Sequence, residues 1–221
     1  MQLSINAILS PDEASDLRRR LASALFEDGS ATAGWAAASV KRNEQAVASV
    51  EIEDLLHATG GRLTANAVFQ LAARPKRIVK AMFSRYVADH VHAYGTHVDN
   101  ALIDGERTDV SFTLFLSEPQ SYDGGELVIE SSGGEEAIKL PAGCVFVYPS
   151  TTLHRVEPVV RGERLAMVGW VRSLVREAAR RELLFDLDTA RRTLFERGGK
   201  TVEFDLLSKS CANLLRMWCD D

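Results

Sequence analysis

The stretch YGTHVDNAL, residues 94–102, places an imidazole and a carboxylate two positions apart, directly in front of an apolar run. We expect residues 97–101 to form a β-strand, in which residues i and i+2 point to the same side. His97 and Asp99 would then project from one face while Val98 turns to the other. The two side chains together suit a metal ion, provided that a third ligand comes from elsewhere in the chain.

That third ligand has few candidates, because the chain contains five histidines: His57, His90, His92, His97 and His154. His57 falls in a predicted helix well before the strands, and DHVHAYG, with His90 and His92, is expected to form a loop over the site. His154 follows the turn PSTTL, where an antiparallel sheet can bring it beside His97. Two imidazoles and one carboxylate leave about three metal positions open, as in non-haem iron(II) oxygenases. Structural zinc usually has four protein ligands, and no fourth ligand is evident.

Arg164 adds a second chemical signal, in the predicted strand ERLAMVGWV. Three apolar side chains share its face of that strand: Ala166, Val168 and Trp170. A buried cation is costly unless it is paired, and an anionic ligand would provide the pair. The planar guanidinium suits a carboxylate, because it can bind both oxygens at once. The alternative is a structural ion pair of Arg164 with Glu126 or Asp109.

Helices are expected in the first third of the chain and again after the strands, at residues 10–26, 43–59, 63–73, 173–196 and 204–218. Ser10, Pro11 and Glu13 form a capping-box pattern at the start of the first helix. Gly60 and Gly61 are expected to end the second helix. Between these helical regions, short runs of β-branched and aromatic residues predict strands. The strands are predicted at residues 78–86, 97–101, 109–116, 126–130, 137–140, 144–148, 154–159 and 164–171.

The strand TDVSFTLFLS, residues 108–117, shows which side of the sheet is expected to face the core. Val110, Phe112 and Leu114 share one face, whereas Ser111 and Thr113 share the other. Closely spaced strands of this kind predict a sandwich or barrel. We therefore expect a mainly β domain with N-terminal helices over residues 1–172, followed by a C-terminal helical extension over residues 173–221.

The composition of the 221 residues is that of an ordinary globular protein, with 46% hydrophobic and 26% charged side chains. The formal net charge is −5, and acidic and basic residues are mixed along the chain. No basic stripe is available for nucleic acid, and no segment approaches the length of a membrane span. We therefore expect a cytoplasmic protein. Cys144, Cys211 and Cys219 contain no CxxC pair, which argues against a disulfide framework or a thiolate zinc site.

The pattern resembles the iron(II)- and 2-oxoglutarate-dependent oxygenases, and within them most closely the bacterial PKHD-type hydroxylases. That branch is similar to prolyl 4-hydroxylases and is linked to iron uptake. The resemblance covers most of the chain, and its fold is a double-stranded β-helix, or jelly roll. It is carried by the residues discussed above and by four further segments: RY (85–86), YDGGELVI (122–129), KLPAGCVFVYPSTTLHRVEPVVRGER (139–164) and SLVREAARRELLFDLD (173–188).

The resemblance also implies roles for individual residues. His97, Asp99 and His154 would hold Fe(II), and Arg164 would bind the distal carboxylate of the cosubstrate 2-oxoglutarate. Tyr86 is expected at the cosubstrate, with Tyr94 as a second tyrosine that lines the same region. Ascorbate is expected as a reductant. The implied reaction is hydroxylation of a peptidyl proline, an amino acid or an iron-uptake metabolite, with succinate and carbon dioxide as coproducts.

Two other functions remain open from the residues alone. The same fold and metal could serve a cupin-like module that binds an organic acid without turnover, because fold alone does not decide function. A metal hydrolase would need a general base near the metal, and none is evident. The C-terminal helices also carry more apolar surface than one exposed face requires, which indicates either a homodimer interface or packing against the barrel. The leucines concerned are Leu183, Leu184, Leu187, Leu194, Leu206, Leu207, Leu214 and Leu215.

Overall fold

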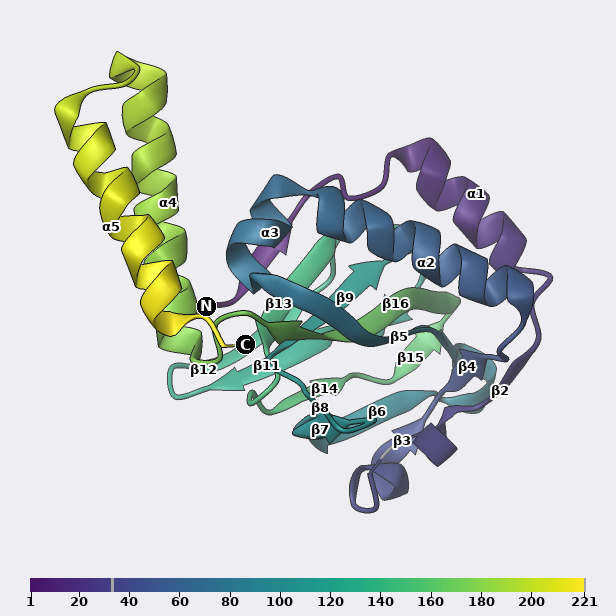
Figure 1. The fold of residues 1–221 in the computed structure, drawn as a ribbon. Coiled ribbons are helices and arrows are strands. Elements are labelled where there is room, and N and C mark those ends of the chain that lie inside the picture. Colours follow the sequence, from purple (N-terminus) through teal and green to yellow (C-terminus); the bar gives the residue numbers. More distant parts are fainter. Residues whose placement is uncertain (33, 221) are drawn as a thin grey trace.

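Two antiparallel β-sheets face each other in the computed structural model, which describes residues 1–32 and 34–220 (Figure 1). The seven-stranded sheet has the order β1 (Leu3–Ile5), β13 (Val145–Pro149), β9 (Val110–Phe115), β16 (Glu163–Ser173), β5 (Pro75–Val87), β4 (Glu44–Ala46) and β2 (Phe26–Asp28). The five-stranded sheet has the order β12 (Gly134–Ile138), β11 (Leu127–Ser131), β14 (His154–Val156), β6 (Ala93–His97) and β3 (Lys41–Arg42). The predicted double-stranded β-helix is thereby confirmed.

Shorter elements complete the sandwich. Two strand pairs lie outside the main sheets, β10 (Asp123–Gly124) with β15 (Val159–Arg161) and β7 (Leu102–Ile103) with β8 (Glu106–Arg107). In the described part of the chain, four 3-10 helices connect the larger elements: η1 (Gly29–Thr32), η2 (Ala37–Val40), η3 (Ala88–His90) and η4 (Pro119–Ser121).

Three helices cover the outer face of the seven-stranded sheet: α1 (Pro11–Leu21), α2 (Val50–Ala65) and α3 (Ala67–Ala73) (Figure 1). The capping box predicted for α1 is present, because the Ser10 hydroxyl accepts from the Glu13 amide at 3.2 Å while the Ser10 amide donates to the Glu13 carboxylate at 2.8 Å. The main core lies between these helices and the sheet. Phe69 of α3 and Phe112 of β9 meet there edge to face, with ring centroids 6.1 Å apart.

The opposite face of β9 points into the space between the two sheets. Val110, Phe112 and Leu114 belong to the main core, as the alternation predicted. Ser111 and Thr113 are also buried, at 2% exposure each. Polar residues on the second face of this strand therefore do not meet solvent, and they are available to build an interior site.

Several helix boundaries differ from the prediction; α3 begins at Ala67 instead of residue 63, and α4 at Ala178 instead of residue 173. The first helix ends at Leu21, and Phe26 lies instead in β2, where it pairs with Ala46 of β4. The second helix begins at Val50 and continues to Ala65. Its glycines do not end it. Gly60 lets the helix approach β5 closely, since a Cβ at that position would lie 3.3 Å from the Ile78 side chain.

Residues 43–49 do not belong to the second helix either. Ser49 caps α2 by accepting a hydrogen bond from the Ile52 amide at 3.2 Å, and residues 44–46 form β4 beside β5. Pairing with a neighbouring strand outweighs the helical propensity of this short polar segment.

The predicted strands overlap observed ones, with two instructive differences. The strand predicted at residues 154–159 divides into β14 and β15, because Pro158 lacks the amide that a continuous ladder needs. The strand predicted at residues 97–101 ends at His97, so that residues 98–100 lie outside any strand. The short strands β1, β2, β3, β4, β7, β8 and β10 were not predicted.

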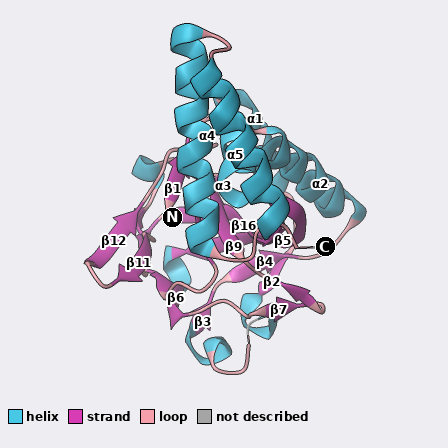
Figure 2. Ribbon diagram, turned by 60° about the vertical axis from the view of Figure 1, so that its left-hand side comes forward, coloured by secondary structure: helices cyan, strands magenta, loops and turns pink. Residues whose placement is uncertain are grey.

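A helical hairpin of α4 (Ala178–Gly198) and α5 (Val202–Trp218) stands away from the sandwich (Figures 1 and 2). Asp188 of α4, only 3% exposed, pairs with Arg74 at the end of α3. After α5, Asp220 pairs with Arg107 at 3.0 Å. The division of the chain into residues 1–172 and 173–221 as separate units stays a prediction.

Within the described residues, no helix is both long and apolar enough to span a bilayer. The three cysteines are free thiols, with Cys144 and Cys211 buried and Cys219 exposed.

Candidate metal centre and its pocket

His97 and His154 are direct cross-strand neighbours, which brings together two residues that are far apart in the sequence. They are paired in the register of β6 with β14, and their ring centroids lie 4.2 Å apart. The Nδ1 atom of His97 lies 2.9 Å from the Gly95 carbonyl, and that of His154 lies 2.9 Å from the Thr152 carbonyl. Because a carbonyl only accepts, each Nδ1 carries the proton and each Nε2 is free to bind a metal.

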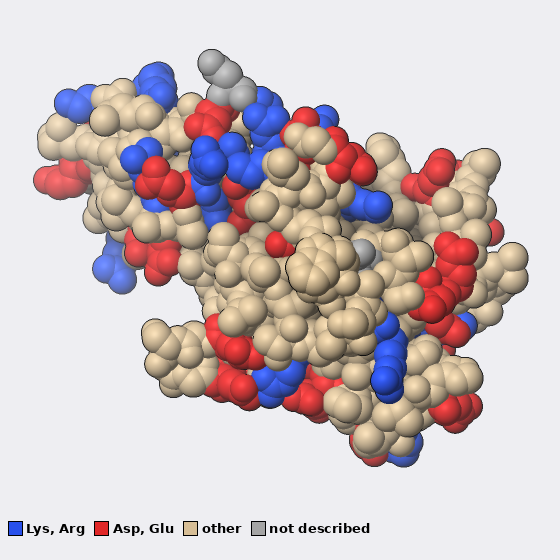
Figure 3. Space-filling view, turned by 90° about the horizontal axis from the view of Figure 1, so that it is seen from below, with Lys and Arg blue, Asp and Glu red and all other residues tan. Residues whose placement is uncertain are grey.

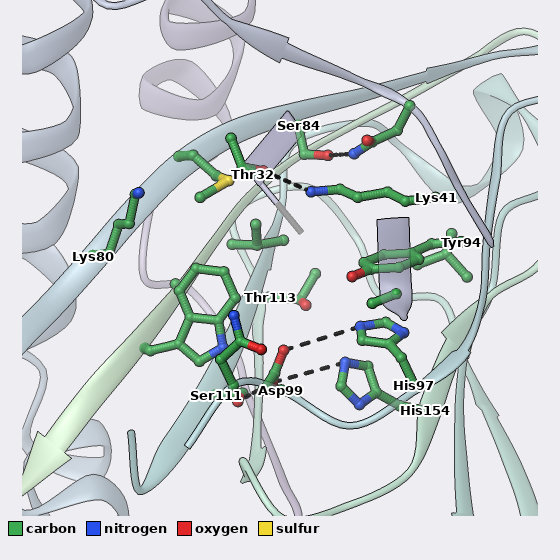
Figure 4. Close-up of a pocket in the computed structure, with 18 of the residues that line it drawn as sticks. Thr32, Lys41, Lys80, Ser84, Tyr94, His97, Asp99, Ser111, Thr113 and His154 are labelled. Carbon is green, nitrogen blue, oxygen red and sulfur yellow. Dashed lines mark hydrogen bonds and ion pairs between the residues drawn. The ribbon is translucent and has the colours of Figure 1, made fainter. Parts of the chain in front are cut away.

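Asp99 closes the group from the loop after β6. Its carboxylate oxygens lie 4.0 Å from the Nε2 of His97 and 3.8 Å from the Nε2 of His154. The ligand atoms of the three residues lie within 4.8 Å of one another. The expected strand geometry is wrong, because Asp99 follows the strand instead of alternating along it. The convergence of the three side chains is nevertheless confirmed, and Figure 4 shows them pointing toward one another.

Ser111, on the opposite sheet, fixes the orientation of this carboxylate. Its hydroxyl lies 2.6 Å from Asp99 Oδ2 and 2.8 Å from the hydroxyl of Ser150. A carboxylate only accepts, so Ser111 donates to Asp99 and in turn accepts from Ser150. Asp99 lies outside any strand, and its carboxylate is instead oriented by a hydrogen bond from the seven-stranded sheet.

The electrostatics of the group favour a metal ion. Burial, together with the neighbouring His154, lowers the pKa of His97 to about 4. The ring is therefore neutral at pH 7 and keeps its nitrogen lone pair for a ligand. Two neutral nitrogens and one carboxylate oxygen form a donor set that suits Fe(II) and leaves open positions.

The three residues line a cavity of about 290 Å³ between the two sheets. Ser111, Thr113 and Tyr148 also line it from the seven-stranded sheet, and Lys41 and Tyr94 line it from the five-stranded sheet. Ser111, Thr113, Tyr148 and Lys41 were not predicted from the sequence to belong to the site. The polar face of TDVSFTLFLS was a usable signal for the first two, because buried polar residues need partners.

The mouth of the cavity carries both apolar and charged side chains, since the exposed residues Lys80 and Asp104 also line the cavity. Val98 and Leu102 line the cavity and are 49% and 63% exposed. Seen from below, uncharged side chains fill the middle of the molecule, and charged side chains lie mostly around them (Figure 3).

Arg164 lines the same cavity and is only 1% exposed. Within the described part of the chain, none of its guanidinium nitrogens has a hydrogen-bond partner. The alternative of a structural ion pair is wrong, because Glu126 pairs with Lys139 at 3.2 Å and Asp109 pairs with Arg107 at 2.7 Å. A buried guanidinium without an acceptor is a strong indication of an anionic ligand.

Two tyrosines flank the charged groups. Tyr86 is the cross-strand partner of Arg164, and its ring centroid lies 5.1 Å from the guanidinium carbon. Burial raises the pKa of Tyr86, so its hydroxyl stays protonated. Tyr94 stacks on His97, with ring centroids 3.6 Å apart. His90 and His92 are not among the residues that line the cavity, and His92 Nδ1 accepts from the Val87 amide at 3.2 Å.

Replacing Ser111 with alanine is expected to weaken metal binding about 10- to 100-fold, the usual effect of losing a hydrogen-bond partner of a metal ligand. Competition with a chromogenic chelator for Mn(II) measures this. Ser117→Ala is the matched control, because that buried hydroxyl accepts from the Leu165 amide at 2.9 Å and does not line the cavity. Equal metal affinity of Ser111→Ala and the unaltered protein would show that Asp99 needs no such support.

Comparison with known proteins gives one consistent result. Residues 81–172 match the 2OG-Fe(II) oxygenase superfamily, and residues 179–220 match the PKHD-type hydroxylase C-terminal domain. A PKHD-type hydroxylase of Picosynechococcus sp. is 52% identical over 221 residues, and one of Gloeothece citriformis is 51% identical over 222 residues; each comparison covers both chains completely.

Solved structures share the fold at lower sequence identity. A Pseudomonas putida prolyl-4-hydroxylase has a TM-score of 0.54 at 24% identity, over 78% of this chain and 92% of that chain. HygX from Streptomyces hygroscopicus, solved with nickel and 2-oxoglutarate bound, has a TM-score of 0.58 at 14% identity, over 80% of this chain and 84% of that chain.

Proposed function

Because this chain belongs to the PKHD-type hydroxylases of the 2OG-Fe(II) oxygenase superfamily, we propose that it couples hydroxylation of an organic substrate to conversion of 2-oxoglutarate into succinate and carbon dioxide. Fe(II) is its metal and 2-oxoglutarate its cosubstrate. The observation that carries the proposal is the presence of two features in one cavity, a His-Asp-His group and a buried guanidinium without an acceptor.

For the metal we propose three protein ligands, the Nε2 atoms of His97 and His154 and the carboxylate of Asp99. The deprotonated Nε2 atoms and the oriented carboxylate support this set. Bound there, Fe(II) supplies the redox chemistry that activates dioxygen. The chain itself holds the ligands in place, with the histidines on one sheet and Ser111 of the other sheet bound to Asp99.

For the cosubstrate we propose that Arg164 binds the distal carboxylate and that Tyr86 packs against the same end. The guanidinium has both a free donor edge and a planar shape that matches a carboxylate. The Tyr86 ring holds the guanidinium from one side, at 5.1 Å. An enclosed ion pair of this kind also keeps water from competing for Arg164.

The test is whether the iron-loaded protein forms succinate from 2-oxoglutarate in air, and whether the rate rises with a cell extract that contains the substrate. A cupin-like binding module would bind 2-oxoglutarate and leave it intact. Succinate formed under air but not under argon supports the oxygenase. Tight binding of 2-oxoglutarate without any succinate would favour the binding module instead.

Several finer assignments remain proposals that rest on the family resemblance alone. We propose a peptidyl proline, an amino acid or an iron-uptake metabolite as the substrate, and ascorbate as a reductant. The cytoplasmic location and the link with iron uptake also stay predictions. An iron-loaded sample assayed with and without ascorbate shows directly whether the reductant prolongs turnover.

We also propose that the protein forms a homodimer through the α4–α5 hairpin. The hairpin stands away from the sandwich, so packing against the sheets does not cover it along its length. Leu184 is buried, at 1% exposure. The remaining apolar surface is carried mainly by Leu183, Leu194, Phe195, Val202, Leu206 and Met217, which are 38% to 73% exposed.

The change Leu206→Glu is expected to shift the protein from dimer to monomer, because it buries a charge in the proposed apolar contact. Sedimentation equilibrium measures the mass. Leu25→Glu is the matched control, since Leu25 is 77% exposed and lies outside the hairpin. A monomeric unaltered protein at high concentration would rule out this dimer.

A further inference from the structure

Lys41 is a second buried cation in the cavity, and no negative charge of the described chain pairs with it. The residue is 8% exposed. Its ammonium donates one hydrogen bond, to the hydroxyl of Thr32 at 2.9 Å. An ammonium has three hydrogen-bond donors and carries a full charge. The neutral Thr32 hydroxyl accepts from one of these donors and does not balance the charge.

The position of Lys41 is fixed close to the metal ligands. Lys41 of β3 lies opposite Tyr94 of β6 in the sheet register, and its ammonium lies 5.3 Å from the Tyr94 ring centroid. Tyr94 in turn stacks on His97 at 3.6 Å. Figure 4 shows this order, with Lys41 above Tyr94, Tyr94 above His97, and the ammonium directed into the cavity toward Thr32. The Tyr94 ring therefore separates a group bound at Lys41 from the metal ligand His97.

Lys41 and Arg164 belong to different sites. Lys41 lies on the five-stranded sheet and faces the Tyr94 ring, whereas Arg164 lies on the seven-stranded sheet and faces the Tyr86 ring. One dicarboxylate held by Arg164 and chelated at the metal has no further carboxylate for Lys41. Lys41 is therefore available to bind a molecule other than 2-oxoglutarate.

Charge balance leads to the same conclusion. Burial lowers the pKa of Lys41 to about 8, and the attraction of Asp99 opposes that change. Once a divalent metal and 2-oxoglutarate are bound, however, their charges and those of Asp99 and Arg164 cancel. Apart from the attraction of the exposed Asp28, the buried charge of Lys41 then has no carboxylate to balance it, which is unfavourable unless a further anion binds.

We propose that the substrate of this hydroxylase is an organic anion whose carboxylate or phosphate group binds the ammonium of Lys41. The proposal rests on the hydroxylase function and specifies the substrate class. The exposed residues Lys80 and Asp104 line the same cavity with opposite charges, so the buried ammonium of Lys41 is the group that favours an anion. A substrate bound in this way places its carbon skeleton beside Tyr94 and the metal position.

The first experiment separates a cell extract on a strong anion exchanger at pH 7 and assays both fractions with the iron-loaded enzyme. Succinate formation and a product with one added oxygen, detected by mass spectrometry, should come from the retained fraction. A phosphatase treatment of that fraction distinguishes the two anions: loss of activity indicates a phosphate, and unchanged activity a carboxylate. Substrate in the unretained fraction would overturn the proposal.

Variants then connect the anion to Lys41. Lys41→Met should raise the KM for the retained substrate about 10- to 100-fold, the effect of one charge-assisted hydrogen bond. Lys41→Arg should restore part of the loss. Lys76→Met is the matched control, since Lys76 is exposed on β5 and does not line the cavity. The KM of this control variant should stay within about twofold of that of the unaltered enzyme. An unchanged KM in Lys41→Met would overturn the proposal.

A binding measurement separates this inference from the hydroxylase function itself. The zinc-substituted protein with 2-oxoglutarate is treated with an amine-acylating reagent, and acylation of Lys41 is followed by peptide mass spectrometry, with Lys76 as internal reference. Acetate or inorganic phosphate should slow acylation of Lys41 more than acetamide or chloride at equal ionic strength.

If the unaltered enzyme forms no succinate with either fraction, the hydroxylase function fails and acylation alone decides the inference. Selective protection of Lys41 by acetate or phosphate would still support an anion site. Equal acylation rates with all four additives would overturn it.

Discussion

Asp99→Ala is expected to abolish succinate formation and to reduce Fe(II) affinity by more than the roughly 10- to 100-fold that loss of a partner of a ligand costs. Asp99 is the one anionic ligand of the proposed set, and its oxygens lie 4.0 Å and 3.8 Å from the two histidine Nε2 atoms. Removing it leaves two neutral imidazoles to hold a dication. Mn(II) or Fe(II) binding measured by calorimetry gives the affinity.

The fold should survive this change. Asp99 lies in a loop outside both apolar clusters, so the melting temperature of the metal-free protein should stay close to that of the unaltered protein. Asp99→Asn keeps the shape and removes the charge, and we expect it to lose most metal affinity as well. Asp89→Ala, at an exposed position in η3, is the control. Normal succinate production by Asp99→Ala would remove Asp99 from the ligand set.

Arg164→Met is expected to weaken 2-oxoglutarate binding about 10- to 100-fold, because one bidentate charge-assisted contact contributes about 1.5–3 kcal/mol. Metal affinity should remain nearly unchanged. The guanidinium is 1% exposed and has no acceptor within the described residues. Replacing it with an apolar side chain should therefore not lower the melting temperature of the ligand-free protein, and should raise it if the unpaired charge is destabilising.

Two parallel titrations check this prediction. Calorimetry of 2-oxoglutarate against the zinc-substituted protein gives the affinity, and thermal melts with and without 2-oxoglutarate show whether the ligand still stabilises the fold. Arg164→Lys should recover only part of the affinity, since an ammonium keeps the charge but loses the planar fork. Unchanged 2-oxoglutarate affinity together with a lowered melting temperature would assign Arg164 a structural role.

Much of the metal site could be predicted from the sequence because its signals are local. The His97 and Asp99 pair is contained within three consecutive residues. Arg164 stands out because a cation within an apolar strand needs a partner that the strand itself lacks. Short β-branched runs separated by glycine and proline also predict antiparallel sheets, and the alternation in TDVSFTLFLS correctly predicted which face of β9 joins the main core.

Local signals failed where pairing between distant segments decides the structure. Residues 43–49 read as the start of a helix, yet β4 forms there because β5 offers it a free edge. The first helix was expected to continue to residue 26 but ends at Leu21, because Phe26 pairs with Ala46 in the sheet. Gly60 was predicted to end a helix, but it lies within α2 and allows close contact between α2 and β5.

The sequence by itself determined the type of chemistry: the two imidazoles, the carboxylate and the guanidinium that a metal and an organic acid require. Only the tertiary structure decided how they are held and what else joins them. The register of β6 with β14 places His154 beside His97, and Ser111 reaches Asp99 from the opposite sheet. Lys41 enters the cavity because β3 pairs with β6. Contacts between sheets join residues far apart in the chain, and hydrophobic periodicity along one segment carries no information about them.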